Sequence, residues 1–584
     1  MRSSILIVLE LFTRLVISSG QSQHVLNNAN HNDATAFFSS LGGGDLDQFI
    51  SGTLRKWKTP GLAIAIVNGT STWTKGFGWA RKNNTVPVNQ FTQFYTGSTT
   101  KSFTAAAMSQ IVDDNDKFPH VQWDTPISSL LRDEFVLSDP WATEHITIRD
   151  ALSHRTGYPA HDFIAWPNAE AATRGLRNLP MSAEPRAKYQ YSNQLVTVIG
   201  YLITRLYYPG AAFSNFPGLL GSIFRGKLWT PMGMEYTYLS TQLNYKDPTK
   251  LPGILADELW YHNDSDSHVA VPHSAHPGHE GAGMVISSVY DYAKYLRYMM
   301  SPSSSSSPFP RDPLSPSGKA ALKSPQIATE PPSTPPFKGA QFYGMGWAGG
   351  VLEGEEVWYH NGQMREHRTE MWMIPSRQFA LAIMTNADTP AITIVLWKVL
   401  YDYFGVPEGR RLDFEKRARE RVVGSQREVE MCLDRLYPLS IPPLPRALPL
   451  TAYAGVYDND GYGNVTLGLR CGDEARGGYP GDTPAHPTVE RGCLLTGSGP
   501  LEFEGKGFHV DFEHVTGDYW IGWLFVDEYA PKGSGLTKRP RLCLRAQFRV
   551  GPEGTVEAFA ADFRREGENG LLVWYEKRKS PAAV

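Results

Sequence analysis

The chain has 584 residues, which is too long for one ordinary hydrophobic core and predicts two or more domains. Hydrophobic residues make up 41% and charged residues 20%, which is typical of a folded protein, and 56 Lys and Arg against 59 Asp and Glu give a formal net charge of −3. This balance provides no positive field for nucleic acid or an anionic membrane surface, so we expect neither as a partner.

Residues 1–20 are predicted to form a secretory signal peptide, with a basic start, an apolar run at 5–9 and small residues at 18–20. Glu10 and Arg14 interrupt the apolar part. Later segments lack the unbroken apolar length that a membrane span requires. We therefore expect a protein that is secreted or lies in the secretory pathway.

The positions of possible glycosylation sites and of cysteines are further evidence on whether the protein enters the secretory pathway. Asn-x-Ser/Thr sequons fit a secreted glycoprotein, although their number is near chance: Asn68, Asn83, Asn263 and Asn464. The cysteines all lie in the last third and lack metal-site spacing: Cys432, Cys471, Cys493 and Cys543. In an oxidising compartment two of the last three could form a disulfide, but the sequence fixes no pairing.

The first folded unit is predicted to span residues 45–410. After a polar lead, a helical pattern over 45–58 precedes two strands at 61–67 and 71–80, and a helix follows from Ser98. The middle is mainly helical, and sheet-like patterns then return before a closing helix, at 346–351, 356–360, 370–374, 379–385 and 391–404. This order predicts an α+β domain whose antiparallel sheet is flanked by helices and assembled from both ends of the segment.

Residues 411–447 are predicted to be a charged helical connector followed by a Pro-rich linker. From 448 to 584 the pattern changes to period-two strands, up to eight of them, with no helix. A small all-β barrel or sandwich is therefore expected as a second domain.

Ser98 and Lys101 form the first candidate motif. At the start of a helix they lie one turn apart on one face, so that the amine reaches the hydroxyl. A desolvated lysine near a helix N-terminus has a lowered pKa and accepts the serine proton, while the helix end favours a developing oxyanion. This is the chemistry of a serine acyl-enzyme, although Ser-x-x-Lys matches also arise by chance.

Two further short motifs follow in order, Tyr191-Ser192-Asn193 and His360-Asn361-Gly362. Each has a competing copy, Tyr457-Asp458-Asn459 and His276-Pro277-Gly278. Context favours the first two, because Tyr191 opens a predicted helix and His360 ends an apolar strand just before a glycine.

These motifs, in this order, resemble the penicillin-binding protein and class C β-lactamase superfamily of serine hydrolases, and its fungal or eukaryotic branch in particular. Residues 147–157, with Ser153-His154 and Gly157, and the glycine-rich segment 281–288 add to the resemblance. The last domain is similar to the lipocalin-like domain that some members append.

The resemblance implies a role for each motif residue. Ser98 would be the nucleophile and Lys101 its base, Tyr191 would relay protons to the leaving group, and Asn193 would bind the acyl side. His360 stands where many relatives carry lysine and would complete the electrostatics around Tyr191.

The third motif would also supply part of the substrate-binding site, through Gly362 and Gln363. The oxyanion hole would combine the backbone N–H groups of Ser98 and Gln363. The resemblance implies no metal and no other cofactor.

After this motif the chain departs from the family, because residues 363–368 carry charged groups where relatives have further glycines. One hypothesis is that Arg365 or Arg368 recognises a substrate carboxylate; the alternative is that both are solvated loop charges. His-rich residues 273–280 suggest a metal site, but Pro272 and Pro277 favour an ordinary loop.

We therefore expect a serine hydrolase that opens a small-molecule ester, amide or peptide through an acyl-enzyme on Ser98. An acyltransferase of the same fold is one alternative, and a non-catalytic binding protein is another. The sequence lacks a Gly-x-Ser-x-Gly elbow, a phosphate-binding loop and a dinucleotide fingerprint, which excludes the most common α/β-hydrolase and nucleotide-enzyme signatures.

Overall fold

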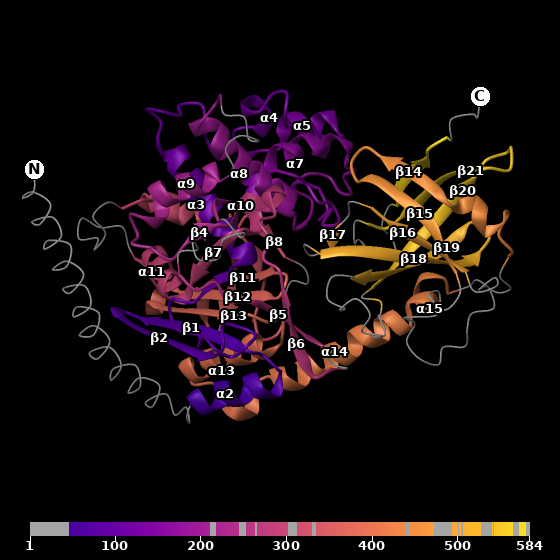
Figure 1. Cartoon of the computed structure of the whole chain (residues 1–584). Coiled ribbons are helices and arrows are strands. Elements are labelled where there is room, and N and C mark those ends of the chain that lie inside the picture. The colour runs from indigo at the N-terminus through magenta and orange to yellow at the C-terminus, as the bar shows by residue number, and fades with distance from the viewer. Residues whose placement is uncertain are drawn as a thin grey trace, which may run out of the picture.

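The computed structural model describes residues 46–579 except for internal segments at 211–217, 244–252, 263–264, 302–311, 330–333, 439–443, 472–492, 500–501, 504–505, 527–539, 541 and 564–571. The predicted signal peptide and the sequon at Asn263 lie outside the described residues. Two units are present, a mixed helix-and-sheet unit and a β-barrel, and a long helix joins them (Figure 1). Within the described ranges, no helix is both long enough and apolar enough to cross a membrane.

An eight-stranded antiparallel sheet forms the centre of the first unit, in the order β2-β1-β13-β12-β11-β10-β9-β8. Its strands are β1 (Gly61–Asn68), β2 (Ser71–Gly78), β8 (Ile327–Ala328), β9 (Phe342–Tyr343), β10 (Ala348–Leu352), β11 (Glu355–Met364), β12 (His367–Ile374) and β13 (Phe379–Thr385). Strands from the start and the end of the unit are therefore neighbours, which confirms the predicted fold class.

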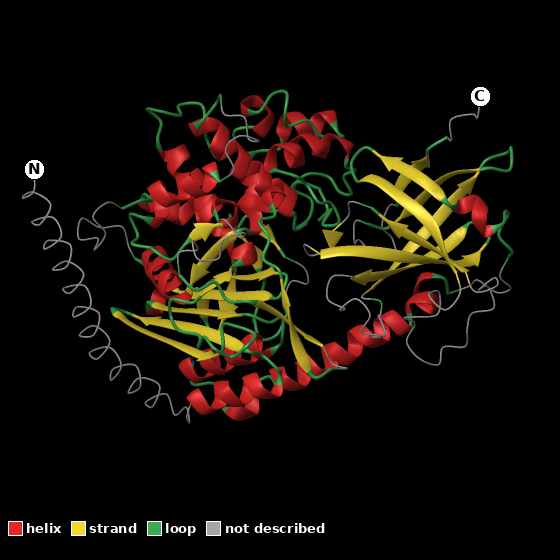
Figure 2. Ribbon diagram, in the orientation of Figure 1, coloured by secondary structure: helices red, strands yellow, loops and turns green. Residues whose placement is uncertain are grey.

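Helices cover both faces of this sheet (Figure 2). The outer face packs against α2 (Leu46–Lys56) and α13 (Ala391–Tyr403). The inner face packs against a thicker layer that includes α3 (Thr100–Asp113), α8 (Asn193–Tyr207) and α11 (Val289–Met300). In β1 alternate residues serve the two cores, because successive strand side chains point to opposite faces.

Short elements complete the inner layer. Its remaining helices are α4 (Ile127–Leu130), α5 (Pro140–His145), α6 (Ile148–Leu152), α7 (Ala169–Gly175), α9 (Leu219–Phe224), α10 (Glu280–Gly283) and α12 (Pro316–Leu322). The region predicted to be mainly helical also contributes small sheets, formed by β3 (Gln93–Tyr95), β7 (Val285–Ser288) and β4 (Tyr238–Leu239), and by β5 (Glu258–His262) and β6 (Ser267–Val271). Of these strands, β3 and β4 have only 3 and 2 residues and are too short for a period-two pattern to reveal them.

The two units are joined by α14 (Phe414–Glu430) and α15 (Cys432–Leu436). The second unit consists of β14 (Gly455–Asn459), β15 (Gly463–Cys471), β16 (Cys493–Ser498), β17 (Glu502–Phe503), β18 (Lys506–Thr516), β19 (Tyr519–Val526), β20 (Leu542–Val550), β21 (Val556–Ala561) and β22 (Val573–Lys577). Pairing of β16 with β18 closes an eight-stranded barrel, to which β17 adds an edge.

All four cysteines are paired, so the structure contains the disulfide expected among the last three and a second one that was not expected. Cys432 bonds to Cys543 and Cys471 bonds to Cys493. The first bond ties α15 to β20 of the barrel, and the second closes the β15–β16 pair.

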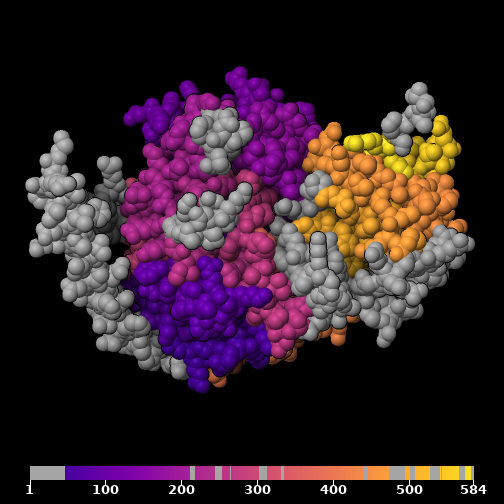
Figure 3. Space-filling view, in the orientation of Figure 1, coloured from indigo at the N-terminus to yellow at the C-terminus, as the bar shows by residue number. Residues whose placement is uncertain are grey.

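The barrel interior is filled by aromatic rings rather than open. Tyr453, Trp520 and Phe548 pack in tilted and edge-to-face contacts with ring centroids 5.0–5.1 Å apart, and Phe559 lies 5.8 Å from Phe548. On its outside the barrel lies against the helical layer of the first unit, where its orange surface meets the purple one in Figure 3.

Candidate active site

Ser98 lies in the turn between β3 and α3, in a 3-10 segment at Gly97–Thr99. Gly97 makes this turn with a φ of +54°, and a Cβ there would lie 2.4 Å from the backbone N of Gln363. A residue with a side chain could not occupy the position without displacing β11. The glycine thus allows the nucleophile turn and β11 to approach each other.

Lys101 is fully buried one turn after Ser98, and its Nζ makes three hydrogen bonds. It donates to Asn193 Oδ1 at 2.7 Å and to the Ala282 carbonyl at 2.7 Å, and it lies 3.1 Å from Ser98 Oγ. Burial lowers the pKa of Lys101 to about 7, and the nearby charge of Asp162 opposes this in part. A large fraction of the amine is therefore neutral at neutral pH.

The geometry orients the neutral amine. Two N–H groups of the neutral amine donate to the oxygens of Asn193 and Ala282, and the lone pair then faces Ser98 Oγ. In this arrangement Ser98 can donate its proton to Lys101, as the activation of a serine nucleophile by a base requires.

Tyr191 precedes α8, and its ring centroid lies 4.7 Å from Lys101 Nζ. Burial raises the pKa of its phenol, and interaction with the Ser98 side chain offsets only part of that rise. The phenol therefore keeps its proton at neutral pH. Tyr191 is a proton donor in this resting site, whereas Lys101 is the group that accepts one.

His360 lies close to the other motif residues but points its nitrogens elsewhere. Its Nδ1 donates to the Asn361 carbonyl at 2.6 Å, which leaves Nε2 to accept from Tyr343 Oη at 2.8 Å. Burial, together with the charge of Lys101, lowers the pKa of His360 to about 3. The ring is thus neutral and lies 6.3 Å from that of Tyr191, so it does not replace a lysine charge beside the phenol.

His154 is a further residue of the site that the motif reasoning did not assign. It is fully buried, its Nδ1 accepts the backbone N–H of Ser192 at 3.1 Å, and its ring lies 4.3 Å from that of Tyr191. The Ser153-His154 motif contains His154, but the sequence assigns it no role. Only the structure shows that its imidazole packs against Tyr191. Tyr343, whose hydroxyl is hydrogen-bonded to Nε2 of His360, belongs to no sequence motif that would have pointed to it.

Gly362 and Gln363 lie where β11 passes the nucleophile turn. A Cβ on Gly362 would lie 1.9 Å from the Thr96 carbonyl oxygen and 3.2 Å from Ser98 N. This approach places the backbone of Gln363 beside that of Ser98, as an oxyanion hole built from their two N–H groups requires.

A cavity of about 460 Å3 opens in front of Ser98. Its walls are largely aromatic, and it is lined by Ser98, Tyr189, Tyr191, Thr329, Tyr343, Ala348, Tyr359, His360, Asn361, Gln363 and Arg368. Arg368 supplies the cationic side chain of this lining, and its Nε lies 2.6 Å from Asp388 Oδ1. Gln363 donates to the other oxygen of the same carboxylate at 3.1 Å.

Arg365 and Arg368 follow the third motif, and the sequence predicts them to be either substrate-carboxylate ligands or solvated loop charges. Arg365 is only 5% exposed, donates to the Pro272 carbonyl at 2.6 Å and lies 3.8 Å from Glu258. It is neither a solvated loop charge nor part of the acyl cavity, because the chain turns there from β11 into β12. Arg368 does line the cavity, but it is paired with Asp388.

The competing motif copies lie elsewhere. Tyr457 is buried in the barrel, where its hydroxyl donates to the Tyr453 carbonyl, and His276 lies in the loop before the short helix at Pro277–His279. Over the described residues, no group of three or more His, Cys, Asp and Glu side chains is arranged to hold a metal ion.

The fold is of the β-lactamase type, and comparison with known families agrees. The Beta-lactamase family model matches residues 46–398, so the chain belongs to the beta-lactamase family. Among curated proteins it is similar to unguisins hydrolase ungD of Aspergillus violaceofuscus (strain CBS 115571), 35% identical over 519 residues that cover 86% of this chain and 85% of the relative. Unguisins hydrolase ungD' of Aspergillus campestris (strain IBT 28561) is 36% identical over 522 residues, 88% of each chain.

Solved structures support the fold over nearly the whole chain. The octameric penicillin-binding protein homologue from Pyrococcus abyssi has 18% identity and a TM-score of 0.52, and the match covers 91% of this chain and 99% of that one. The crystal structure of SurE has 17% identity and a TM-score of 0.50, with 93% and 100% covered. At these identities the likeness shows the fold alone.

Proposed function

We propose that the protein is a serine hydrolase that opens an amide or ester through an acyl-enzyme on Ser98. One observation carries the proposal: the buried Lys101 amine, with a pKa near neutrality, lies 3.1 Å from Ser98 Oγ and is held there by two carbonyl oxygens. Membership of the beta-lactamase family and two fungal relatives named hydrolases support it.

Acylation begins when the Lys101 lone pair takes the Ser98 proton as Oγ attacks the substrate carbonyl carbon. The carbonyl oxygen becomes an oxyanion between the N–H groups of Ser98 and Gln363. Each donor of this kind contributes about 3 kcal/mol to transition-state stabilisation. Because both donors are backbone groups, side-chain changes at Gln363 leave the hole in place.

Collapse of the tetrahedral intermediate breaks the bond to the leaving group. The Tyr191 phenol donates its proton to the departing nitrogen or oxygen, and protonated Lys101 returns a proton to Tyr191. A water molecule then attacks the acyl-enzyme while Lys101 again accepts a proton, and Ser98 is regenerated. In an acyltransferase an alcohol or amine would take the place of this water.

The cavity favours an uncharged, partly apolar acyl group. Its walls are formed by Tyr189, Tyr343 and Tyr359, and the charge of Arg368 is already compensated by Asp388. We infer that the substrate is a small ester or amide, and the unguisins in the names of the two relatives are the first compounds to test.

The proposal is tested by labelling with a fluorophosphonate probe followed by peptide mass spectrometry. We expect one adduct on Ser98. We expect Ser98→Ala to lose this adduct and to turn over acyl esters at least about 1000-fold more slowly. Ser109→Ala is the matched control, because Ser109 lies on the same helix and its buried hydroxyl has no hydrogen-bond partner among the described residues. A folded protein that no acylating probe modifies would instead be a binding protein.

A further inference from the structure

The segment from Tyr158 to Phe163 runs between the active site and the barrel, and it carries an acidic residue toward Lys101. Asn193 Nδ2 donates to Asp162 Oδ1 at 3.1 Å, while Asn193 Oδ1 accepts from Lys101 Nζ at 2.7 Å. A carboxylate only accepts hydrogen bonds, so Asp162 forces the amide to present its nitrogen to Asp162 and its oxygen to Lys101. The orientation of Asn193, and through it that of the base, depends on Asp162.

The residues on either side of Asp162 face the barrel. His161 is fully buried, its Nε2 donates to the Pro180 carbonyl at 3.0 Å, and its Nδ1 accepts from the Tyr462 hydroxyl at 2.5 Å. Its φ of +49° is unusual for a residue with a side chain and is maintained by contacts on both nitrogens. A barrel residue thus stabilises the backbone conformation next to Asp162.

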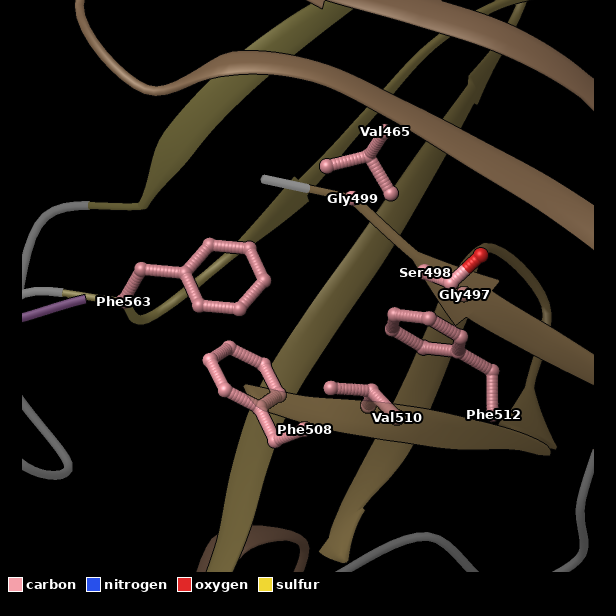
Figure 4. Close-up of a pocket in the computed structure, with 8 residues that line it drawn as sticks. All are labelled: Val465, Gly497, Ser498, Gly499, Phe508, Val510, Phe512 and Phe563. Carbon is pink, nitrogen blue, oxygen red and sulfur yellow. The ribbon is translucent and has the colours of Figure 1, made fainter. Parts of the chain in front are cut away.

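Phe163 makes the second contact with the barrel. Its ring lies 5.5 Å from that of Phe508 and 5.7 Å from that of Phe563, in edge-to-face geometry. Figure 4 shows these two barrel rings on one side of a small hollow. The hollow has a volume of about 10 Å3, roughly the space of a single water molecule.

The barrel hairpin that carries Tyr462 is itself fixed to the first unit. Asn459 Oδ1 accepts the backbone N–H groups of Gly461 and Tyr462, and Asn178 Nδ2 donates to the Asp460 carbonyl at 3.2 Å. The phenol of Tyr462 therefore reaches His161 from a well-defined turn.

We propose that the barrel is a positioning domain for the catalytic base: through Tyr462 on His161 and the Phe508–Phe563 pair on Phe163, it fixes Asp162, which orients Asn193 toward Lys101. The inference rests on the proposed function, since it gives Lys101 the role of base. Asp162 is a positioning residue, because it acts through Asn193 and through its charge.

Because Asp162 is charged, the proposal predicts a measurable change in the pKa of Lys101 when Asp162 is replaced. The ionisable groups that interact with Lys101 are Asp162, Tyr191, His154 and His360, and burial keeps the last three neutral at neutral pH. Asp162 is thus the negative charge that opposes the desolvation of Lys101. Its removal lowers the pKa of Lys101 further, and the pH at which acylation begins falls with it.

The test compares three variants with wild type by the rate of Ser98 labelling with a fluorophosphonate across pH 5–9, and by melting temperature. Asp162→Asn keeps an oxygen for Asn193 but removes the charge, so we expect the rising limb of the pH profile to move to lower pH. Tyr462→Phe removes one hydroxyl from the domain interface, and we expect labelling to slow about 5- to 30-fold, with a shift of the limb in the same direction.

Tyr457→Phe is the matched control. It also removes one buried hydroxyl of the barrel, which donates to the Tyr453 carbonyl, but it has no contact with residues 158–163 among those described. We expect it to lower the melting temperature as much as Tyr462→Phe while labelling proceeds at the wild-type rate.

The outcomes separate the two proposals. Wild type that is never labelled overturns the proposed function and this inference with it. If wild type is labelled, and Tyr462→Phe and Asp162→Asn are labelled at the same rates and with the same pH profile, the inference alone is overturned. Equal slowing by Tyr462→Phe and Tyr457→Phe also overturns it, because the effect would then follow general destabilisation of the barrel. Asp162→Asn, which leaves the interface intact, keeps the test valid if Tyr462→Phe does not fold.

Discussion

Lys101 shows how a single buried residue combines electrostatics with geometry. Desolvation disfavours its charged form, and its two carbonyl partners decide where the lone pair of the neutral form points. Desolvation and lone-pair orientation are both needed for Lys101 to act as a base, since a neutral amine that faced away from Ser98 would not accept the Ser98 proton. Arginine could not substitute for it, because a guanidinium does not lose its proton in proteins.

We predict that kcat/KM for acyl esters rises with pH through about 7. Lys101 is protonated and unable to act as a base below its pKa of about 7, and it becomes neutral above that pH. The measurement is the pH dependence of kcat/KM between pH 5 and 9. Lys101→Arg should lose activity over the whole range, and a wild-type profile that is flat from pH 5.5 to 8.5 would refute Lys101 as the titrating base.

Individual site residues differ in how far the sequence could reveal them. Ser98 and Lys101 could be predicted together, because i,i+3 spacing on a helix places side chains on one face whatever the rest of the chain does. Asp162, His154 and Tyr343 could not be assigned roles, since they come from loops or very short strands whose positions depend on tertiary packing. The same packing turns His360 toward Tyr343 rather than toward Tyr191.

At the level of elements, β11 does most to shape the site. Its period-two pattern appeared to end at His360, but the structure extends it to Met364 because Gly362, Gln363 and Met364 pair with β12. That pairing converts an expected loop into a hairpin and buries Arg365 at its turn. Cross-strand partners, which a single sequence does not identify, set the end of this strand.

We predict that Gly362→Ala lowers kcat about 100-fold or more. The new Cβ would lie 1.9 Å from the Thr96 carbonyl oxygen, so β11 must move away from the nucleophile turn and the Gln363 N–H leaves the oxyanion position. Steady-state kinetics on an acyl ester measures the effect. Gly468→Ala is the control, because Gly468 also lies in a strand and an added Cβ meets nothing within 4 Å. Near-wild-type kcat in Gly362→Ala would argue against this oxyanion hole.

On the scale of the whole molecule, the barrel is attached to the hydrolase unit in two places. Its turn at Asp460–Tyr462 and the rings of Phe508 and Phe563 contact the helical layer directly. The connector provides the other attachment, where Cys432 packs with Val515 and Ile521 and bonds to Cys543. The existence of a second β domain could be predicted from composition and periodicity, whereas its contacts and both disulfide pairs could not, because they join residues far apart in the chain.

We predict that the two disulfides contribute unequally to the stability of the barrel. Cys432–Cys543 spans 111 residues and Cys471–Cys493 spans 22, which in the chain-entropy description corresponds to about 4–5 and about 3 kcal/mol. Calorimetry of the Cys432→Ser/Cys543→Ser and Cys471→Ser/Cys493→Ser double variants should show the larger fall in melting temperature for the first. An equal or larger fall for the second would mean that native-state contacts outweigh loop length.

The position of β1 in the sheet, between β2 and β13, has a consequence for biosynthesis. Thr59 and Thr389, beside these two strands, share a hydrogen bond although 330 residues separate them. The ribosome must therefore release most of the hydrolase unit before β1 gains its second neighbour, and until then the β1–β2 hairpin exposes an unpaired edge. Nascent chains that end before β13 would be prone to associate through this edge, and Ser98 would gain its surroundings only late in translation.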